Sequence, residues 1–196
     1  MWEEMELDPG FLKRDEIRKA GRPVEIARTK RLLIRETILE DVPELYRICQ
    51  EDGIRGWVKP LQPTLEEELD FMRAYISHAY PFYDFGLWTV LDRSSGQVIG
   101  RAGLSVSELL DDAVELGYLI DPVRQRQGYA KECGQAILAY ARDVLDMEKL
   151  HLLTDCRNEA SLRTAAALGF MEMERLKRDG AELVHLVWSA ASFANF

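Results

Sequence analysis

Residues 115–141 read ELGYLIDPVRQRQGYAKECGQAILAYA, and this stretch decides the fold of the 196-residue chain. An alternating apolar run typical of a β-strand ends at Asp121-Pro122, and a polar loop with two arginines leads to Gly128 at the start of an amphipathic helix. Backbone N–H groups at a helix N-terminus lack intrahelical partners and lie at the positive end of the helix dipole. The stretch therefore predicts a site for a phosphate group at the start of this helix.

Positive charge gathers at this loop in a chain that is otherwise acidic. Gly128 has no Cβ and lets a ligand approach the backbone, while Arg124, Arg126 and Lys131 add local positive charge. The formal net charge of the whole chain is -9, which argues against a nucleic-acid partner and is also consistent with plain solubility.

Length and composition indicate one globular domain with an additional segment. Hydrophobic residues make up 47% of the chain and charged residues 30%, which is enough apolar material for a core. The apolar runs are too short to span a bilayer and no signal peptide is visible, so we expect a cytoplasmic protein without a membrane partner. Residues 1–28 are expected to form an N-terminal extension outside the core fold, followed by a single domain over residues 29–192.

Neither cysteines nor histidines have the spacing of a metal site. The cysteines are Cys49, Cys133 and Cys156. They are odd in number, widely separated and set in apolar patterns, so we expect buried free thiols rather than disulfides. The histidines are His78, His151 and His185. They stand alone in the sequence, so each is expected to be a core or surface residue rather than a ligand, and no metal is predicted.

The remaining chain alternates between strand and helix patterns. Strands are expected at residues 30–37, 85–91, 97–106, 114–120, 149–156, 170–177 and 181–189. Helices are expected near residues 11–20, 41–49, 64–80, 128–144 and 158–167. The strand, helix, strand order over residues 114–156 predicts two parallel strands joined by a right-handed crossover, whereas the other strands read as hairpins.

Several residues carry signals for the ends of these helices. Asp41 and Thr64 are expected N-caps, and each is followed three residues later by a glutamate. The second of these helices is expected to end before Pro81. Asn158 can cap a short helix that ends near Gly169.

Motifs along the chain resemble those of one known family. Residues 125–130, QRQGYA, resemble the Q/R-x-x-G-x-G/A acyl-CoA signature of the GNAT N-acetyltransferases. Residues 29–41, TKRLLIRETILED, look like the first strand of the branch that includes the ribosomal-protein N-terminal acetyltransferases. Asn158-Glu-Ala-Ser161 and Leu168-Gly169-Phe170 are similar to that branch's N-x-x-S and L-G-F motifs. The resemblance covers roughly residues 29–190 in the right order.

The resemblance implies an α/β (α+β) GNAT fold. This fold has a mixed, mostly antiparallel sheet of about seven strands, helices on both faces, and a parallel pair, the fourth and fifth strands, that splays apart. The resemblance also implies acetyl-CoA as the acyl donor and direct attack by a primary amine within a ternary complex. The amine is either a protein N-terminus or a small molecule, and a homodimer is compatible with this reading.

By the same resemblance, the cofactor contacts the fourth strand and the glycine loop. The backbone of Leu119 and Ile120 is expected to bind the pantetheine arm as an added strand would. The pyrophosphate is expected to bind the backbone N–H groups of Gln125, Arg126, Gln127, Gly128, Tyr129 and Ala130. Asn158 is expected to contact the pantetheine, to cap a helix, or to do both.

The resemblance also suggests catalytic residues. Glu115 is the only carboxylate within the fourth strand, so it could accept the ammonium proton directly or through water. Its alternatives are a strand-edge charge or a group that only binds a cationic substrate. Ser161 is the candidate for assisting the departing thiolate, and Tyr118 and Tyr129 are expected to pack.

Two points leave the function open. Aromatic residues flank the second helix and either line an acceptor pocket or belong to the core: Trp57, Phe82, Tyr83 and Trp88. The family often has a lysine just before L-G-F, where this chain has Ala167. A non-catalytic acyl-CoA-binding or interaction module that retains the fold is therefore the alternative to an enzyme.

Overall fold

The centre of the molecule is a mixed β-sheet. The computed structural model describes residues 6–7, 11–178 and 180–193. The strands are β1 (Glu6–Leu7), β2 (Glu25–Arg28), β3 (Leu32–Arg35), β4 (Leu87–Asp92), β5 (Val98–Ser107), β6 (Ala113–Ile120), β7 (Lys149–Asp155), β8 (Met171–Arg178) and β9 (Ala181–Ser189). Within the described residues they form one sheet in the order β1-β2-β3-β4-β5-β6-β7-β9-β8.

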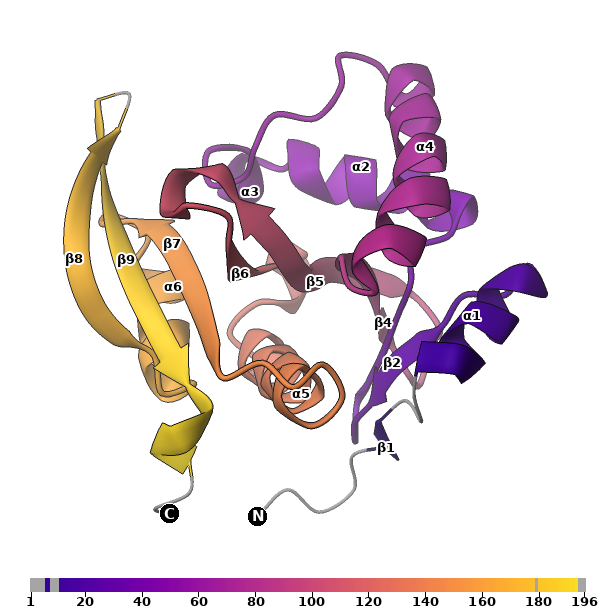
Figure 1. The fold of residues 1–196 in the computed structure, drawn as a ribbon. Helices are drawn as coiled ribbons and strands as arrows, with labels where there is room; N and C mark the ends of the chain where they lie inside the picture. The colour runs from indigo at the N-terminus through magenta and orange to yellow at the C-terminus, as the bar shows by residue number, and fades with distance from the viewer. Residues whose placement is uncertain (1–5, 8–10, 179, 194–196) are drawn as a thin grey trace.

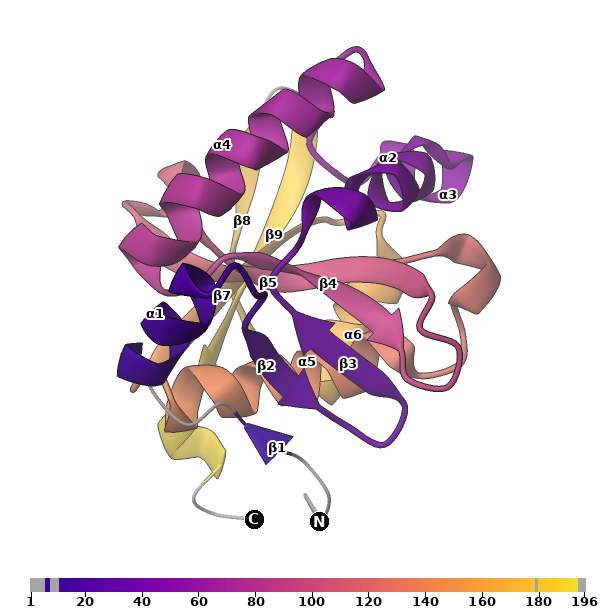
Figure 2. The ribbon, with the colours of Figure 1, turned by 90° about the vertical axis from the view of Figure 1, so that its right-hand side faces the viewer.

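Helices cover both faces of this sheet. They are α1 (Phe11–Lys19), α2 (Val42–Gln50), α3 (Asp52–Arg55), α4 (Leu65–Tyr83), α5 (Tyr129–Asp143) and α6 (Glu159–Ala167). In Figures 1 and 2, α2, α3 and α4 lie on one face, called here the α4 face, and α5 and α6 lie on the other, the α5 face. None of the helices in the described part of the chain combines the length and the apolar character needed to cross a bilayer.

Strands β6 and β7 are parallel and separate soon after they meet. Their register contains a single pair, Glu115 opposite His151, whereas β6 pairs with β5 along its whole length from Ala113 to Ile120. The other neighbouring strands of the described sheet pair antiparallel. The predicted fold, with a splayed parallel pair in a mostly antiparallel sheet, is confirmed.

The segment before residue 29 contributes to the sheet. The seven expected strands are all present, and β1 and β2 extend the sheet beyond β3. Val24 and Ile26 are fully buried in the main core. The expected boundary before residue 29 therefore falls within the β2–β3 hairpin. A four-residue strand beside Pro23 is too short for its pattern to distinguish it from a loop.

Helix α4 begins as predicted and ends later than predicted. The Thr64 N–H group donates to Glu67 Oε2 at 3.0 Å, and the Glu67 N–H group donates to Thr64 Oγ1 at 3.2 Å. The expected end before Pro81 is wrong, because the helix continues to Tyr83. Asp84 closes the helix in a left-handed conformation, with its N–H group donating to the Tyr80 carbonyl. A proline in the last turn removes only one backbone donor, and the helix tolerates this loss.

Asp41 occupies the N-cap position of α2 as expected, but its side chain does not cap the helix. Its carboxylate accepts hydrogen bonds from Arg35 Nη2 and Thr89 Oγ1, both at 2.8 Å, and makes no side-chain cap to the helix. A 3-10 turn, η1 (Leu39–Asp41), precedes α2 instead. Asp41 therefore ties the start of α2 to the sheet, which a local capping signal cannot reveal.

Helix α5 packs on the sheet through the face that the sequence predicts. Cys133, Ile137 and Tyr140 are fully buried, and the Tyr140 ring meets the Trp88 ring edge-on, with 5.4 Å between centroids. Burial raises the pKa of the Cys133 thiol, so this cysteine stays protonated and unreactive. Cys156 is only half-buried, and all three cysteines are free thiols.

Asp84 connects the N-terminal helix to the end of α4. Arg14 Nε and Arg18 Nη1 each donate to the Asp84 carboxylate at 3.0 Å, and Arg18 also pairs with Glu36 at 2.7 Å. The side chains of Arg14 and Arg18 are 3% and 12% exposed, so their charges are largely removed from water. The carboxylate that both arginines share is therefore important for stability.

We predict that Asp84→Asn destabilises the protein by about 3 kcal/mol in urea denaturation, because it removes a charge from a buried ion-pair network. Asn tolerates the left-handed backbone at this position, so strain does not contribute. Asp70→Asn is the matched control, since its ion pair with Arg73 is exposed and should contribute less than about 1 kcal/mol. Equal losses in the two variants would contradict this role of Asp84.

Candidate functional site

The loop between β6 and α5 presents backbone N–H groups at an open helix N-terminus. Arg126 and Gly128 both have a left-handed backbone, with φ of 60° and 81°. Gly128 is the N-cap of α5 and has no side chain that could occupy the N–H groups of the first turn. Residues 125–128 are exposed. Consecutive N–H groups in such a turn form a concave site that suits an anion.

Arg31, just before β3, holds this loop in place. Its Nη1 donates to the Gln127 carbonyl at 2.8 Å, its Nε donates to Glu132 Oε2 at 2.6 Å, and its guanidinium carbon lies 4.3 Å from the centroid of the Tyr129 ring. Burial raises the pKa of Glu132, but hydrogen bonds from Thr29 and Arg31 outweigh this effect and lower it overall. The sequence did not indicate that Arg31 and Glu132 support the loop, because the two residues are far apart in the chain and no local pattern links them.

Other side chains of the loop turn away from the helix N-terminus. Arg124 Nη2 donates to Gln97 Oε1 at 2.9 Å. The Tyr129 side chain is buried, with its hydroxyl 3.4 Å from Asp92 Oδ2, and it packs as expected. Tyr129 and the half-buried Ala130 can therefore offer a ligand mainly their backbone.

Leu119 and Ile120 differ in the direction of their backbone groups. The Asp121 N–H group donates to the Ile99 carbonyl on β5, and neighbouring residues of a strand direct their backbone groups to opposite sides. Ile120 therefore faces away from β5, where Gln125 Nε2 donates to its carbonyl at 3.0 Å. Leu119 faces β5, opposite Arg101. The prediction of a backbone contact with the cofactor now depends on Ile120 rather than on Leu119.

Two hydroxyl groups meet on the α5 face, where β6 has parted from β7. The Tyr118 hydroxyl lies 3.2 Å from the Ser161 carbonyl and 3.4 Å from Ser161 Oγ. Asn158 caps α6, since its side chain accepts from the Ser161 N–H group at 3.1 Å. Burial raises the pKa of Tyr118, so its hydroxyl keeps its proton at neutral pH. Tyr118 packs as expected, and in addition its hydroxyl reaches Ser161, which sequence reasoning did not foresee.

Glu115 lies on the opposite face of the same strand. Side chains alternate between the two faces along a strand, and Leu119, four residues on, packs against Ile48 and Ile54 on the α4 face. Glu115 therefore points to the α4 face. Its Oε2 atom is buried and has no hydrogen-bond partner among the described residues.

The strand surface beside Glu115 is open. Gly117 is the next residue of β6 on the α4 face, and a Cβ added there would meet its nearest neighbour, Leu87 Cδ2, only at 3.8 Å. A glycine inside a strand often marks a place where a ligand approaches closely. The bare backbone at Gly117 thus gives access to the edge of β6 from the side of Glu115.

A cleft of about 300 Å³ lies on the α4 side, next to this open strand surface. It includes Ser105, which pairs with Glu115 across β5 and β6. Aromatic side chains form one part of its lining and carboxylates another: Tyr75, Tyr83, Phe85, Glu108 and Asp112. Of the aromatic residues expected to line an acceptor pocket, only Tyr83 does so, since Trp88 is buried in the core and Trp57 and Phe82 are exposed.

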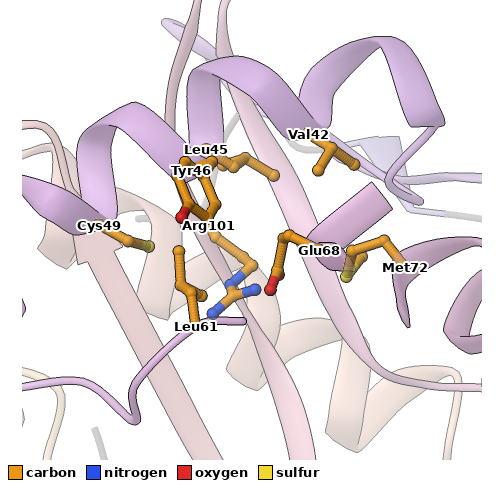
Figure 3. Close-up of a pocket in the computed structure, with 8 residues that line it drawn as sticks. All are labelled: Val42, Leu45, Tyr46, Cys49, Leu61, Glu68, Met72 and Arg101. Carbon is orange, nitrogen blue, oxygen red and sulfur yellow. The ribbon is translucent and has the colours of Figure 1, made fainter. Parts of the chain in front are cut away.

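A smaller pocket lies between α2, α4 and β5 (Figure 3). Arg101 and Glu68 point toward one another in it, and Glu68 Oε2 accepts from the Gln62 N–H group at 3.0 Å. Burial raises the pKa of the adjacent Cys49. The volume of this pocket, about 10 Å³, is close to that of one water-sized probe, so the pocket cannot admit a substrate.

Two of the histidines are hydrogen-bonded to each other, which the sequence did not indicate. His151 Nδ1 lies 2.9 Å from His185 Nε2, and His185 Nδ1 lies 3.2 Å from Glu174 Oε1. They are 34 residues apart in the chain, and only the sheet order, with β9 beside β7, brings them together.

Solved structures share this architecture. RimL, a ribosomal L7/L12 alpha-N-protein acetyltransferase, superposes in its apo form with a TM-score of 0.73 at 16% identity, covering 94% of this chain and 99% of RimL. A RimL structure in complex with coenzyme A gives a TM-score of 0.69, covering 82% and 95% of the two chains. A protein from Bordetella pertussis described as a GnaT-family acetyltransferase gives 0.70 at 23% identity, covering 86% and 99%. At these identities the matches establish the fold alone.

Sequence comparison identifies the family. YoaA, an N-acetyltransferase of Bacillus subtilis (strain 168), is 22% identical over 148 residues, which is 75% of this chain and 83% of YoaA. YkkB of the same organism is 28% identical over 97 residues, or 49% of this chain, and the match spans little more than half of YkkB, 56%. The profile of the family described as acetyltransferase (GNAT) domain matches residues 31–171, well over half of the sequence. The chain therefore belongs to the GNAT family of acetyltransferases.

Proposed function

We propose that the protein transfers an acetyl group from acetyl-CoA to a primary amine by direct attack within a ternary complex. One observation carries this proposal: β6 places Glu115 on one face of the sheet and Tyr118 on the other, at the point where the strand parts from β7. A thioester bound in this opening would have a carboxylate on one side and hydroxyl groups on the other. Membership of the family supports acetyl transfer, and the geometry supports the roles of the residues.

Acetyl-CoA would bind along β6 and the glycine loop. The N–H groups of residues 125–130 suit the pyrophosphate, because they lie at the open N-terminus of α5. The pantetheine arm, which contains amides, can pair with the backbone of Ile120 as an added strand would. Gln125 now donates to the Ile120 carbonyl, so a pantetheine amide would take over this hydrogen bond. RimL, which shares the fold, has been solved with coenzyme A.

The reaction would use the two faces of β6 separately. The amine approaches from the α4 face across Gly117, and Glu115 accepts a proton from its ammonium form, directly or through water. The free amine forms the new C–N bond, and the C–S bond breaks toward the α5 face. Ser161 and Tyr118 can donate a hydrogen bond or a proton to the departing thiolate, since Tyr118 keeps its proton at neutral pH.

The cleft indicates the kind of amine. Aromatic side chains such as Tyr75 and Phe85 can contact apolar groups of the acceptor, while Glu108 and Asp112 favour a positive charge. We infer that the acceptor is a primary amine with an apolar part and a cationic part. A peptide N-terminus followed by basic residues and a small polyamine both fit this description.

We predict that an acceptor screen, followed by release of free thiol from acetyl-CoA, finds turnover with such amines. Glu115→Gln should lower kcat by about 10²-fold at pH 7, because the base is lost. The loss should shrink toward pH 10, where a primary amine deprotonates without help. Binding of acetyl-CoA without thiol release from any amine or peptide would instead support a non-catalytic acyl-CoA-binding module.

We predict that Gly128→Ala weakens binding of coenzyme A at least tenfold in calorimetry, because a Cβ at this left-handed position strains the backbone that presents the N–H groups. Gly96→Ala is the matched control, since Gly96 has φ of 72° with open space around it in the β4–β5 turn. Both variants should lose similar stability, of about 1 kcal/mol. If Gly96→Ala weakens binding equally, the glycine loop is not the pyrophosphate site.

We predict that Tyr118→Phe and Ser161→Ala each lower kcat by about 10-fold to 10²-fold while the Kd of acetyl-CoA stays nearly constant, because both hydroxyls act on the leaving thiolate. The double variant should lose little more than the worse single variant, as expected of residues that act as a unit. Tyr46→Phe removes a surface hydroxyl that donates to the Pro63 carbonyl and should leave kcat unchanged. Unchanged kcat in both single variants would exclude this role.

A further inference from the structure

A row of polar side chains crosses the α4 face from β6 to the edge strand β8. Glu115 pairs with His151 across β6 and β7, Leu153 with His185 across β7 and β9, and His185 with Glu174 across β9 and β8. Paired residues in a sheet share a face. The buried neighbours of the histidines, Leu152 and Leu186 among them, point to the α5 face instead. The row therefore begins at the base proposed above.

The hydrogen bonds limit where the protons of the two imidazoles can lie. A carboxylate only accepts hydrogen bonds, so His185 must donate to Glu174 through Nδ1–H. When both imidazoles are neutral, each has one N–H group, so His185 Nε2 accepts and His151 donates to it through Nδ1–H at 2.9 Å. His151 Nε2 is then left without a proton. Nδ1 is engaged on the β9 side, and none of the described residues makes a hydrogen bond to Nε2.

The surroundings keep His151 neutral and ready to accept a proton. Burial, together with the nearby His185 and Lys149, lowers the pKa of His151 below its ordinary value. The titratable and charged groups that face it are Glu115 on β6, Lys149 on its own strand, His185 on β9 and, beyond it, Glu174 on β8. The side chain of His185 is 10% exposed and that of Glu174 is 56% exposed, so the row ends at a solvent-exposed carboxylate.

We propose that His151, His185 and Glu174 form a proton wire that carries the acceptor's proton from Glu115 to solvent. The proton leaves the Glu115 carboxyl group and reaches His151 Nε2 directly or through water, while the Nδ1–H proton of His151 passes to His185 Nε2. The Nδ1–H proton of His185 passes to Glu174, and the exposed carboxylic acid releases it to water. Each bond to hydrogen that forms is matched by one that breaks, and exchange of ring protons with water restores the starting tautomers. The inference rests on the proposed function, since acetylation of the amine supplies the proton.

Kinetics of single variants test the wire. His151→Gln and His185→Gln should each lower kcat at pH 7 by about 10-fold or more, with the KM for acetyl-CoA unchanged. Added imidazole should restore a large part of kcat in His151→Gln, because it replaces a proton carrier. His78→Gln, on the exposed surface of α4, is the control and should match the unaltered protein. Full activity of both variants overturns the wire, and so does a loss of activity that imidazole does not rescue.

Two further measurements do not depend on the fate of these variants. Glu174→Gln changes an exposed side chain, and the amide can neither fix the tautomer nor carry the proton, so kcat should fall and regain activity with added buffer. Nitrogen NMR of the unaltered protein should show His151 and His185 both protonated at Nδ1 near pH 7.5. Protonation at Nε2 of His151 overturns the wire, even if no amine is acetylated. Absence of any acetyl transfer combined with the expected tautomers would count against the proposed function instead.

Discussion

The parting of β6 from β7 is the constraint on which the proposed site depends. β5 binds β6 along its length and β9 binds β7 along its length, yet the two parallel strands share only the pair Glu115 and His151. Beyond that pair, the backbone groups of β6 that face β7 cannot bond to it. Buried backbone groups need a partner, and the Gln125 side chain supplies one at the Ile120 carbonyl. The fold thus keeps a strand edge available that a ligand containing amides can complete.

The same strand also separates two kinds of chemistry. Because side chains alternate, Glu115 and Tyr118 lie on opposite faces although they are three residues apart. A carboxylate and a phenol on the same face would hydrogen-bond to each other, and neither would be available to a substrate. On opposite faces, the carboxylate can take a proton from an amine while the phenol keeps its own for a departing group. The alternation of side chains along one strand therefore keeps the proposed base, Glu115, apart from the proposed acid, Tyr118.

The features that the sequence predicted correctly depend on short-range chemistry. The starts of three helices depend on neighbouring residues, so local sequence patterns predict them: Gly128 for α5, Asn158 for α6 and Thr64 for α4. The errors arise where distant segments meet. The Asp41 side chain accepts a hydrogen bond from Thr89 instead of capping α2, and Asp84 holds the end of α4 because arginines of α1 reach it. Such contacts leave no local pattern.

The candidate site divides in the same way. The glycine loop and Glu115 were named from motifs, whereas Arg31, the hydroxyl contact of Tyr118 and the histidine pair required the sheet order. The sequence also could not predict that the backbone groups of Leu119 face β5. Alternation along a strand divides its residues into two sets, but it does not show which set faces β5. Register decides that question, and register is set by long-range pairing.

The unsatisfied oxygen of Glu115 and the histidine row both concern how a buried carboxylate binds a proton donor and then passes the proton on. Leaving a buried acceptor unpaired costs about 1–3 kcal/mol, and a bound ammonium group would recover part of this cost. A base that is covered by substrate and cofactor cannot return its proton to water directly, so a carboxylate alone would stall after accepting one proton. In the proposed wire, the imidazole of His151, which pairs in register with Glu115, would remove that difficulty. The arrangement of Glu115 beside His151 is thus more consistent with proton transfer than with simple binding of a cation, for which a second acidic side chain at position 151 would serve better.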